Sequence, residues 1–307
     1  MAERKLKGTD PKAAKPSRPK IVIFGKPGVG KTWGSLDFPS VYYVDTEGGA
    51  NLEHYTDKLK ASGGAYLGPN DGANSFDTVI EEIVTLATTK HQFRTLVIDS
   101  FSKLFNTQVD MTYEQMAKGD GADRKPRDMD KTFGAEKKPA IAATRRLIRW
   151  CDKLDMNVLL ICHEKSLWAD GKEVGTAPDA WDKLSYELHL SLQIIKQGAS
   201  RKARVMKSRL SGFPDGTAFD WSYHEFAKRF GRDVIEGEAQ QLLLASPEHV
   251  SRLATLVDVL RIPADVTDKW REKAGVEDWS EMDAETVAKC ISYCESKLPP
   301  VAASTAA

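Results

Sequence analysis

The sequence predicts an α/β fold: a mostly parallel β-sheet with helices on both faces, extended by antiparallel strands and followed by a small helical unit. From Lys20 onward, short apolar runs alternate with helical patterns, which is the rhythm of buried parallel strands joined by crossover helices. A glycine-rich segment, residues 25–32, directly follows the first apolar run, as in a strand–turn–helix unit. The 307 residues are enough for one such domain and a second small one.

The expected elements follow from these patterns in chain order. Residues 1–19 are rich in Lys, Arg, Pro and Ala without an apolar period, which predicts a disordered basic tail that either touches a phosphate backbone or is simply solvated. The predicted parallel strands of the core are Ile21–Phe24, Val41–Val44, Leu96–Ile98 and Val158–Cys162. Three later strands have no helix-length insert between them and are expected to extend the sheet antiparallel: Leu188–Ile195, Ala203–Met206 and Thr217–Trp221.

After the core, the pattern changes to amphipathic helices. Two apolar faces recur at helical spacing: Leu253, Leu256, Val257 and Leu260 form one, and Val287, Ile291, Cys294 and Leu298 form the other. Between Glu236 and Leu298 there are thirteen acidic residues and seven basic ones. The sequence therefore predicts a core at residues 20–235, an acidic helical module at 236–298 and an unstructured tail at 299–307.

Composition excludes several classes of protein. Forty-four basic and forty-four acidic residues leave no net charge, so a nucleic-acid site would have to be a local patch. The four cysteines form no C-x-x-C pair and lack a histidine cluster, which favours reduced cytosolic thiols over structural zinc. No apolar run approaches the length of a membrane span, and no hydrophobic signal core is present at the N-terminus. We expect a cytoplasmic protein without membrane association.

The glycine-rich segment is a complete G-x-x-x-x-G-K-[ST] phosphate loop. Its residues are Gly25, Lys26, Pro27, Gly28, Val29, Gly30, Lys31 and Thr32. Glycines let backbone N–H groups surround a polyphosphate, Lys31 reaches the β and γ phosphates, and the Thr32 hydroxyl ligates Mg²⁺. The motif predicts binding of a nucleoside triphosphate, with an ordinary glycine turn as the alternative. Trp33 follows directly and is expected in the core.

Carboxylates follow two of the predicted strands. The strand Thr95–Asp99 ends in Asp99, the position from which a carboxylate holds Mg²⁺ beside Thr32. Because serine follows Asp99, the carboxylate that activates water must come from elsewhere. Glu47, at the carboxyl end of the strand after the phosphate loop, is the candidate for orienting the attacking water. In the alternative, Asp45 and Glu47 only begin a turn.

Polar side chains also follow two later strands. His163 comes directly after Val158–Cys162 and could sense a γ-phosphate, although a lone histidine is often structural. Lys207 and Arg209 share one side of a strand because side chains two residues apart point to the same face. Two cations at this spacing suit the charge of a transferring phosphoryl group, and a solvated basic strand is the alternative. The predicted cofactors are ATP and Mg²⁺.

The sequence also bears on two other nucleotide-dependent classes of protein. A GTPase would need an N-K-x-D motif after a later strand, and the sequence has none. A small-molecule kinase carries a basic lid, which the basic side chains of residues 118–138 could imitate. A P-loop kinase therefore stays an alternative.

The order of these motifs resembles the RecA-like P-loop ATPase core, shared by RecA recombinases and DnaB-type helicases, over residues 20 to about 230. The resemblance implies that Glu47 is the catalytic glutamate and that His163 stands where RecA has a glutamine sensor. It also implies that Lys207 and Arg209 reach the ATP site of a neighbouring subunit, so that the active form is a homo-oligomeric ring or filament. The D-T-E-G-G segment and the helical C-terminal unit look most like phage-encoded ATPases that bind and anneal single-stranded DNA.

In RecA-like proteins, the DNA path is lined by the loop after the strand that corresponds to Thr95–Asp99 and by the loop after the strand that corresponds to Val158–Cys162. The resemblance places these loops at residues 118–138 and 164–184. Basic side chains track phosphates and aromatic rings stack on bases. The candidate DNA contacts are Lys118, Arg124, Lys125, Arg127, Lys131, Lys165 and Trp168. The first loop also carries five acidic residues, so a solvated loop is the alternative.

The expected function is a Mg²⁺-dependent ATPase that binds single-stranded DNA and promotes annealing or homologous recombination as an oligomer. A single-strand-binding protein is a candidate partner, and the location is the host cytoplasm if the chain is phage-encoded. The alternatives are a DnaB-like helicase or translocase, a nucleotide-gated binding module with little turnover, and the kinase.

Overall fold

The computed structural model describes residues 17–49, 53–118 and 134–298. The chain divides into two compact units. The first runs to Leu86 and from His91 to Gln240, and the second comprises Ala87–Lys90 and the chain from Gln241 onward. None of the helices in the described ranges has the length and apolar character needed to cross a membrane.

An eight-stranded sheet forms the centre of the first unit, in the order β10-β9-β8-β1-β5-β4-β2-β3. Its strands are β1 (Lys20–Phe24), β2 (Val41–Asp45), β3 (Ala65–Leu67), β4 (Thr95–Asp99), β5 (Asn157–Cys162), β8 (Leu190–Gln197), β9 (Ser200–Ser208) and β10 (Ala218–Asp220). The strands from β8 to β3 in this order all pair in parallel, whereas β9 and β10 are antiparallel to their neighbours. The mostly parallel sheet with an antiparallel extension is as predicted.

The direction predicted for the strand at residues 188–195 is wrong. This strand, β8, pairs in parallel with β1, with Ile21 opposite Leu190 and Phe24 opposite Gln193. A parallel partner requires the chain to return to the starting edge through a crossover of a dozen or more residues. Residues 163–189 provide that length, so the antiparallel extension begins one strand later, at β9.

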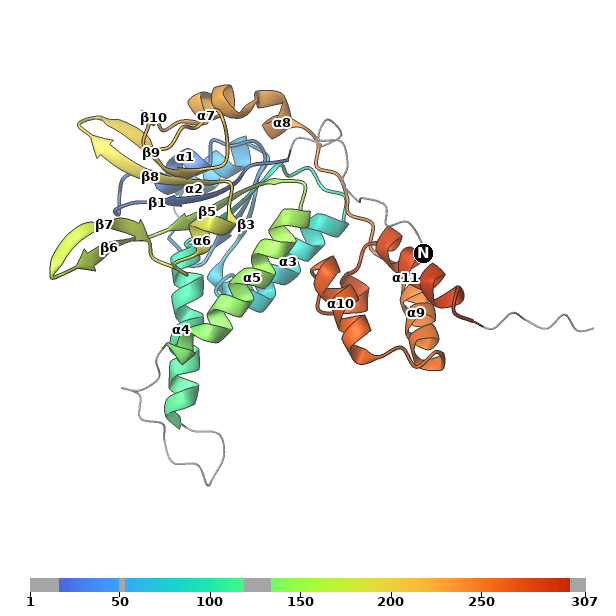
Figure 1. Ribbon diagram of the computed structural model, residues 1–307. Coiled ribbons are helices and arrows are strands. Elements are labelled where there is room, and N and C mark those ends of the chain that lie inside the picture. The colour runs from blue at the N-terminus through green and yellow to red at the C-terminus, as the bar shows by residue number, and fades with distance from the viewer. Residues whose placement is uncertain (1–16, 50–52, 119–133, 299–307) are drawn as a thin grey trace, which may run out of the picture. The chain divides into compact units, whose positions relative to one another are not determined.

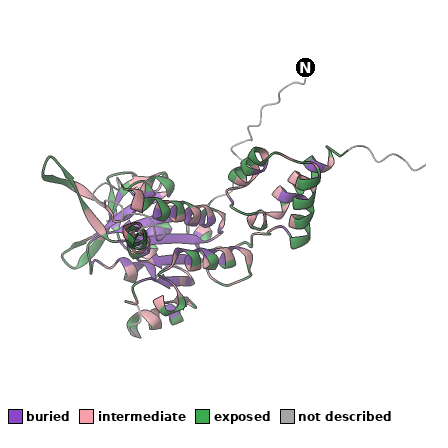
Figure 2. Ribbon diagram, turned by 90° about the horizontal axis from the view of Figure 1, so that it is seen from below, coloured by how far each residue is buried: buried purple, intermediate pink, exposed green. Residues whose placement is uncertain are grey.

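Helices cover both faces of the sheet, as predicted (Figure 1). They are α1 (Lys31–Ser35), α2 (Glu53–Ala61), α3 (Phe76–Thr88), α4 (Phe101–Lys118), α5 (Lys138–Lys153), α6 (Leu184–Glu187), α7 (Tyr223–Phe230) and α8 (Arg232–Glu236), with short 3₁₀ turns at Pro69–Asp71 and Ala135–Lys137. Alternate strand residues such as Ile21 and Ile23 pack with Leu36, Leu59 and Phe226 from the α1, α2 and α7 side. Figure 2 shows the buried strands enclosed between helices.

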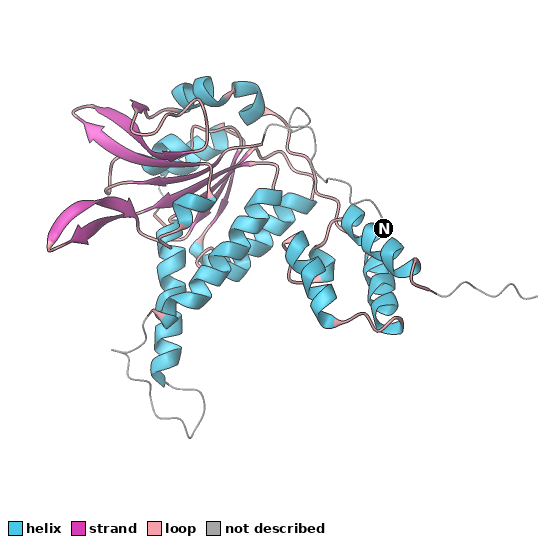
Figure 3. Ribbon diagram, viewed as in Figure 1, coloured by secondary structure: helices cyan, strands magenta, loops and turns pink. Residues whose placement is uncertain are grey.

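A second, two-stranded sheet stands where the sequence predicts a loop. β6 (Glu164–Ala169) and β7 (Lys172–Pro178) form an antiparallel hairpin, which projects from the same end of the molecule as the β8–β9 hairpin (Figure 3). Asp170 and Gly171 at its turn have positive φ angles of 50° and 73°. Asp-Gly at a two-residue turn is a strong hairpin signal, so this element could have been found from the sequence.

Arg18 belongs to the core rather than to the predicted N-terminal tail. Only 8% of its surface is exposed. Its Nε lies 3.1 Å from Oδ1 of Asp155, and its guanidinium also donates to the carbonyl oxygen of Glu238 at 2.8 Å. A buried guanidinium requires such partners, and here they tie the chain before β1 to the end of the first unit. Residues 1–16 and 299–307 lie outside the described residues.

The second unit is helical, as predicted for the C-terminal region. It contains α9 (Pro247–Val259), α10 (Ala264–Ala274) and α11 (Ala284–Glu295), with a 3₁₀ turn at Trp279–Glu281. Its own core includes Leu253, Met282, Val287, Ile291 and Cys294, which are all buried. The two apolar faces that the sequence indicates therefore pack within this unit, except for Leu298, which is 40% exposed.

Candidate nucleotide-binding site

The phosphate loop connects β1 to α1 in the conformation that its glycines require. Gly28 and Gly30 have φ angles of 73° and 90°, a left-handed region that other residues rarely adopt. Gly25 lies against β8, since a Cβ atom there would come within 2.4 Å of the Ile194 carbonyl oxygen. A larger residue at any of these three positions would displace or strain the loop.

Lys31 is folded back onto its own loop. Its Nζ donates to the carbonyl oxygens of Gly25 at 2.7 Å and Lys26 at 3.0 Å. Burial lowers the pKa of Lys31, and the nearby Asp99 carboxylate opposes that shift. Phosphate oxygens are stronger acceptors than these carbonyls, so a polyphosphate in the loop would compete for the same ammonium.

Thr32 and Asp99 meet, as the metal-site prediction requires. The Thr32 hydroxyl donates to Oδ2 of Asp99 at 2.5 Å, and the Tyr43 hydroxyl donates to the same oxygen at 2.9 Å. Burial raises the pKa of Asp99, and these two hydrogen bonds oppose the increase. Hydroxyl and carboxylate oxygens side by side fit Mg²⁺, which takes few protein ligands and shares the rest of its coordination with phosphate and water.

A pocket of about 200 Å³ opens beside this pair. Its lining residues are Thr32, Tyr43, Asp45, Glu47, Gly49, Tyr55 and Asp99. These residues come from four segments of the chain: α1, β2 with the turn after it, α2 and β4. The four segments converge on one cavity at the carboxyl edge of the sheet. This is the edge at which open α/β sheets bind their ligands.

Glu47 contacts the strand end that carries His163. Oε1 of Glu47 accepts a hydrogen bond from the Ser100 hydroxyl at 2.6 Å and lies 3.0 Å from Nε2 of His163. Two residues predicted separately for the site are thus brought together by the adjacent ends of β2, β4 and β5. Ser100, which the sequence marked only as the residue after Asp99, is the third member of this cluster.

Asp45 has a different environment from Glu47. Its Oδ1 accepts the backbone N–H groups of Glu47 at 3.0 Å and Gly48 at 2.8 Å, and its Oδ2 accepts the Tyr66 hydroxyl at 3.0 Å. These contacts are those of a carboxylate that shapes a turn. The turn-forming alternative therefore describes the contacts of Asp45, although both Asp45 and Glu47 line the pocket.

Lys207 and Arg209 lie at the opposite edge of the sheet from their own phosphate loop. The loop follows Phe24, the last residue of β1, whereas Lys207 pairs with Ser191 near the beginning of β8. Their side chains donate to the carbonyl oxygens of Leu188 and Tyr186, respectively. Burial and the adjacent Arg209 lower the pKa of Lys207. Neither cation joins the site that contains Thr32 and Asp99 in the same chain.

The residues predicted to contact DNA lie in different environments, and some lie outside the described residues. Arg124, Lys125, Arg127 and Lys131 lie outside the described residues. Lys118 ends α4, with its ammonium 3.7 Å from Oε2 of Glu114. Lys165 bonds Oδ1 of Asp182 at 2.7 Å. Trp168, on the β6–β7 hairpin, is 67% exposed.

The core position expected for Trp33 is wrong, since 46% of its surface is exposed. Nζ of Lys58 lies 3.9 Å from the centroid of the indole ring, and the rings of His54 and Tyr55 lie 6.0 Å away. Tyr43 is the functional candidate that the sequence reasoning missed. The hydroxyl group of a tyrosine in a buried strand needs a hydrogen-bond partner, and that requirement could have identified Tyr43.

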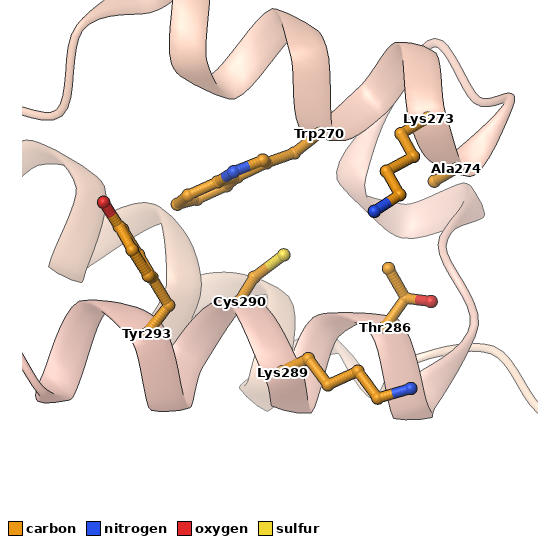
Figure 4. Close-up of a pocket in the computed structure, with 7 residues that line it drawn as sticks. All are labelled: Trp270, Lys273, Ala274, Thr286, Lys289, Cys290 and Tyr293. Atoms are coloured by element: carbon orange, nitrogen blue, oxygen red, sulfur yellow. The ribbon is translucent and has the colours of Figure 1, made fainter. Parts of the chain in front are cut away.

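A larger pocket, about 350 Å³, lies within the helical unit between α10 and α11 (Figure 4). It is lined by Trp270, Lys273, Ala274, Thr286, Lys289, Cys290 and Tyr293. None of the predicted site residues contributes to it. The larger of the two pockets therefore lies apart from the phosphate loop and its acidic partners.

Comparison with known proteins identifies a protein family that matches this chain. Residues 17–210, more than half of the chain, match the family described as an AAA domain. Among solved structures, the crystal structure of the RadB recombinase is similar at 17% sequence identity and a TM-score of 0.40, over 66% of this chain and 87% of that one. The search of curated proteins found no match.

Proposed function

Because the chain belongs to the AAA-domain family, we propose that it is a Mg²⁺-dependent ATPase that acts on single-stranded DNA, in annealing or homologous recombination. The observation that carries the ATPase proposal is the convergence of Thr32, Asp99 and Glu47 on one pocket beside the phosphate loop. Metal ligands and a carboxylate for water are the parts that phosphoryl transfer to water requires.

Each residue has a proposed part in the reaction. Lys31 and the N–H groups of the loop bind the β and γ phosphates, and Thr32 and Asp99 would hold Mg²⁺. When bound, Mg²⁺ offsets the negative charge that develops on the phosphates. Glu47 positions the attacking water and accepts its proton, while Ser100 and His163 fix the Glu47 carboxylate.

The DNA proposal is supported by the hairpin that begins directly after His163. The exposed Trp168 on this hairpin offers a surface on which a base can stack. Gln193 of β8 donates to Glu164 Oε2 at 3.0 Å and Thr176 Oγ1 at 2.9 Å, so the hairpin is attached to the strand next to β1. We propose that His163 and this hairpin couple the presence of the γ-phosphate in the nucleotide site to DNA binding.

The placement of Lys207 and Arg209 supports a role at the ATP site of a neighbouring subunit and not at the site of their own chain. A cation at the far edge of its own sheet cannot reach its own nucleotide, but a head-to-tail neighbour would bring that edge onto the next phosphate loop. The proposed active form is therefore a ring or filament of identical subunits in the cytoplasm, of the phage-encoded annealing type. A single-strand-binding protein is its candidate partner.

The test is phosphate release from ATP with and without single-stranded DNA, run beside a measurement of particle size. We expect DNA to raise the rate and the particle size together, and Lys31→Ala to abolish turnover. ATP hydrolysis unaffected by DNA would contradict the DNA proposal. Tight binding with negligible turnover would indicate a nucleotide-gated module, and phosphate transfer to a small molecule would indicate a kinase. Directional strand separation would favour a helicase or translocase.

A further inference from the structure

The β8–β9 hairpin places a second cation, Arg201, against the phosphate loop of the same chain. A Cβ atom at Gly30 would come within 2.6 Å of Arg201 Nε and 2.7 Å of Arg201 Cδ. The arginine side chain therefore lies directly on the last glycine before Lys31. Along the chain Arg201 lies far from the loop, in a stretch from Lys196 to Arg209 that has six basic residues and no acidic one.

Trp221 connects the backbone of Arg201 to the phosphate loop through two hydrogen bonds. Its carbonyl oxygen accepts the backbone N–H of Trp221 at 2.9 Å, and the indole Nε1 of Trp221 donates to the carbonyl oxygen of Gly30 at 3.1 Å. Trp221 is 93% buried and packs so closely on α1 that a Cβ at Gly34 would come within 2.2 Å of its Nε1. The loop, Trp221 and Arg201 thus form one closed set of contacts.

Strand geometry explains why Arg201, and not its basic neighbours, reaches the loop. Ala203 and Val205 are buried in the core on the α1 side of the sheet, and Arg201 shares their face because side chains alternate along a strand. Lys202 points to the other face and pairs with Asp220 at 2.7 Å. Lys207 lies six residues further along, roughly 20 Å at the usual rise of a strand.

The guanidinium of Arg201 is available for a ligand. The side chain is exposed, and within the described part of the chain no carboxylate lies within ion-pair distance of it. Guanidinium groups bind phosphate oxygens through pairs of parallel hydrogen bonds. Lys31, in contrast, supplies a single ammonium from inside the loop.

We propose that Arg201 is a phosphate-binding residue of the nucleotide site, supplied by the same chain that supplies the phosphate loop. This inference rests on the proposed ATP site and adds a residue to it. The β9 strand then has two functional ends: Arg201 binds the nucleotide of its own subunit, whereas Lys207 and Arg209 face the neighbour's. The hairpin carrying Arg201 also becomes a nucleotide-dependent element.

The first test compares nucleotide affinity in three variants by calorimetry with ATP and with AMP. Arg201→Ala should weaken ATP binding by about 10- to 100-fold, the usual effect of losing a charge-assisted hydrogen bond, and should affect AMP less. Arg201→Lys should lie between Arg201→Ala and the parent, because it keeps the charge but loses the paired geometry. Arg204→Ala, on the opposite face of β9, is the matched control and should stay within about twofold.

The second test separates action in the same chain from action on a neighbour. Arg201→Ala and Lys31→Ala damage the same site, so mixing the two proteins should restore no ATPase activity. The mixture of Arg209→Ala with Lys31→Ala is the positive control for exchange between subunits. Recovery with Arg201→Ala would overturn the assignment to the same chain.

Parent-like ATP affinity in a folded Arg201→Ala protein would overturn the phosphate-binding role altogether. The unfolding temperature of each variant, measured beside its ATP affinity, identifies a variant that has lost its fold. If Arg201→Ala does not fold, the ATP affinity of Arg201→Lys is compared with that of the parent instead. A parent chain that binds no ATP at all would instead contradict the proposed function itself. The two failures are thus distinguishable.

Discussion

Nε2 of His163 lies 3.0 Å from Oε1 of Glu47, so the end of β5 contacts the acid that follows β2. The Ser100 hydroxyl donates to the same Glu47 oxygen at 2.6 Å, and the cluster links three strand ends. A carboxylate held by two neighbours cannot turn freely. Its orientation toward the pocket is therefore tied to the segment that starts the β6–β7 hairpin.

The first prediction concerns Glu47. Glu47→Gln should bind ATP as tightly as the parent but hydrolyse it at least about a hundredfold more slowly, because an amide cannot accept the proton of water. Binding by calorimetry and phosphate release in a single turnover measure the two steps separately. Hydrolysis within a few-fold of the parent would place the catalytic carboxylate elsewhere.

The second prediction concerns His163, whose ring meets Glu47. In His163→Ala, the ratio of DNA-stimulated to basal hydrolysis should fall toward one, because the contact between the site and the hairpin is lost. Trp168→Ala is the comparison variant, since it should weaken DNA binding by about 1–3 kcal/mol without touching the nucleotide pocket. Undiminished stimulation in His163→Ala would exclude this histidine from the coupling.

The third prediction uses the hydrogen bond from Tyr43 to Asp99. In Tyr43→Phe, the Mg²⁺ concentration for half-maximal ATP binding should rise about tenfold, because Asp99 loses a donor that orients it and supports its ionised form. Affinity for ATP in the presence of EDTA should change little. Tyr66→Phe is the matched control, because Tyr66 bonds Asp45 instead. Equal Mg²⁺ requirements in the two variants would contradict the role of Tyr43.

The sequence predicted those parts of the site whose residues are close together along the chain. The loop from Gly25 to Thr32 and the strand that ends at Asp99 are contiguous motifs, and parallel pairing brings them to one edge without further information. Tyr43 and Ser100 were missed because their partners lie in other strands. Residue type alone shows that a buried hydroxyl needs a partner, but it does not say which one.

The position of Lys207 and Arg209 shows where local reasoning fails. A period of two assigns side chains to the faces of a strand, but it gives neither the direction of β9 nor the register shift between its residues Val205 and Lys207. Had residues 188–195 been antiparallel to β1, as predicted, β9 would run parallel to β1 and carry Lys207 toward the phosphate loop. The crossover through residues 163–189 reverses both strands, and Arg201 occupies the loop end instead.

The fourth prediction is a pH dependence of stability from Lys20. Burial lowers the pKa of this lysine from 10.5 to about 8, although its Nζ donates to the carbonyl oxygens of Leu154 and Met156 at 2.7 Å. Between these pH values the folded chain has lost the proton that the unfolded chain still holds. Linkage then requires the free energy of unfolding to increase with pH across this window, by up to about 3 kcal/mol.

The measurement is denaturant unfolding of the parent and of Lys20→Met between about pH 7 and pH 10.5. The unfolding free energy of the parent minus that of the variant should rise with pH across this range. Taking this difference cancels the contribution of the other titratable groups, which are the same in both proteins. A difference that stays constant with pH would mean that Lys20 keeps its ordinary pKa in the fold.

The fifth prediction tests action across subunits. Arg209→Ala keeps a sound phosphate loop but lacks the cation, and Lys31→Ala keeps the cation but lacks a sound loop. Each protein alone should be nearly inactive, and mixing should recover part of the activity, because some interfaces pair an intact loop with an intact cation. The recovery should be easily measured, since such a cation is worth about 10³–10⁵ in rate.

The same arrangement makes activity depend on assembly. ATPase activity should rise more steeply than linearly with protein concentration, and single-stranded DNA should lower the concentration needed by gathering subunits on one strand. Lys202→Ala serves as the control, because this lysine pairs with Asp220 in its own chain at 2.7 Å. Full activity in a strictly monomeric preparation, or no recovery on mixing despite proven co-assembly, would remove Arg209 from the neighbour's site. The far-edge position of Arg209 would then serve only its contact with the Tyr186 carbonyl.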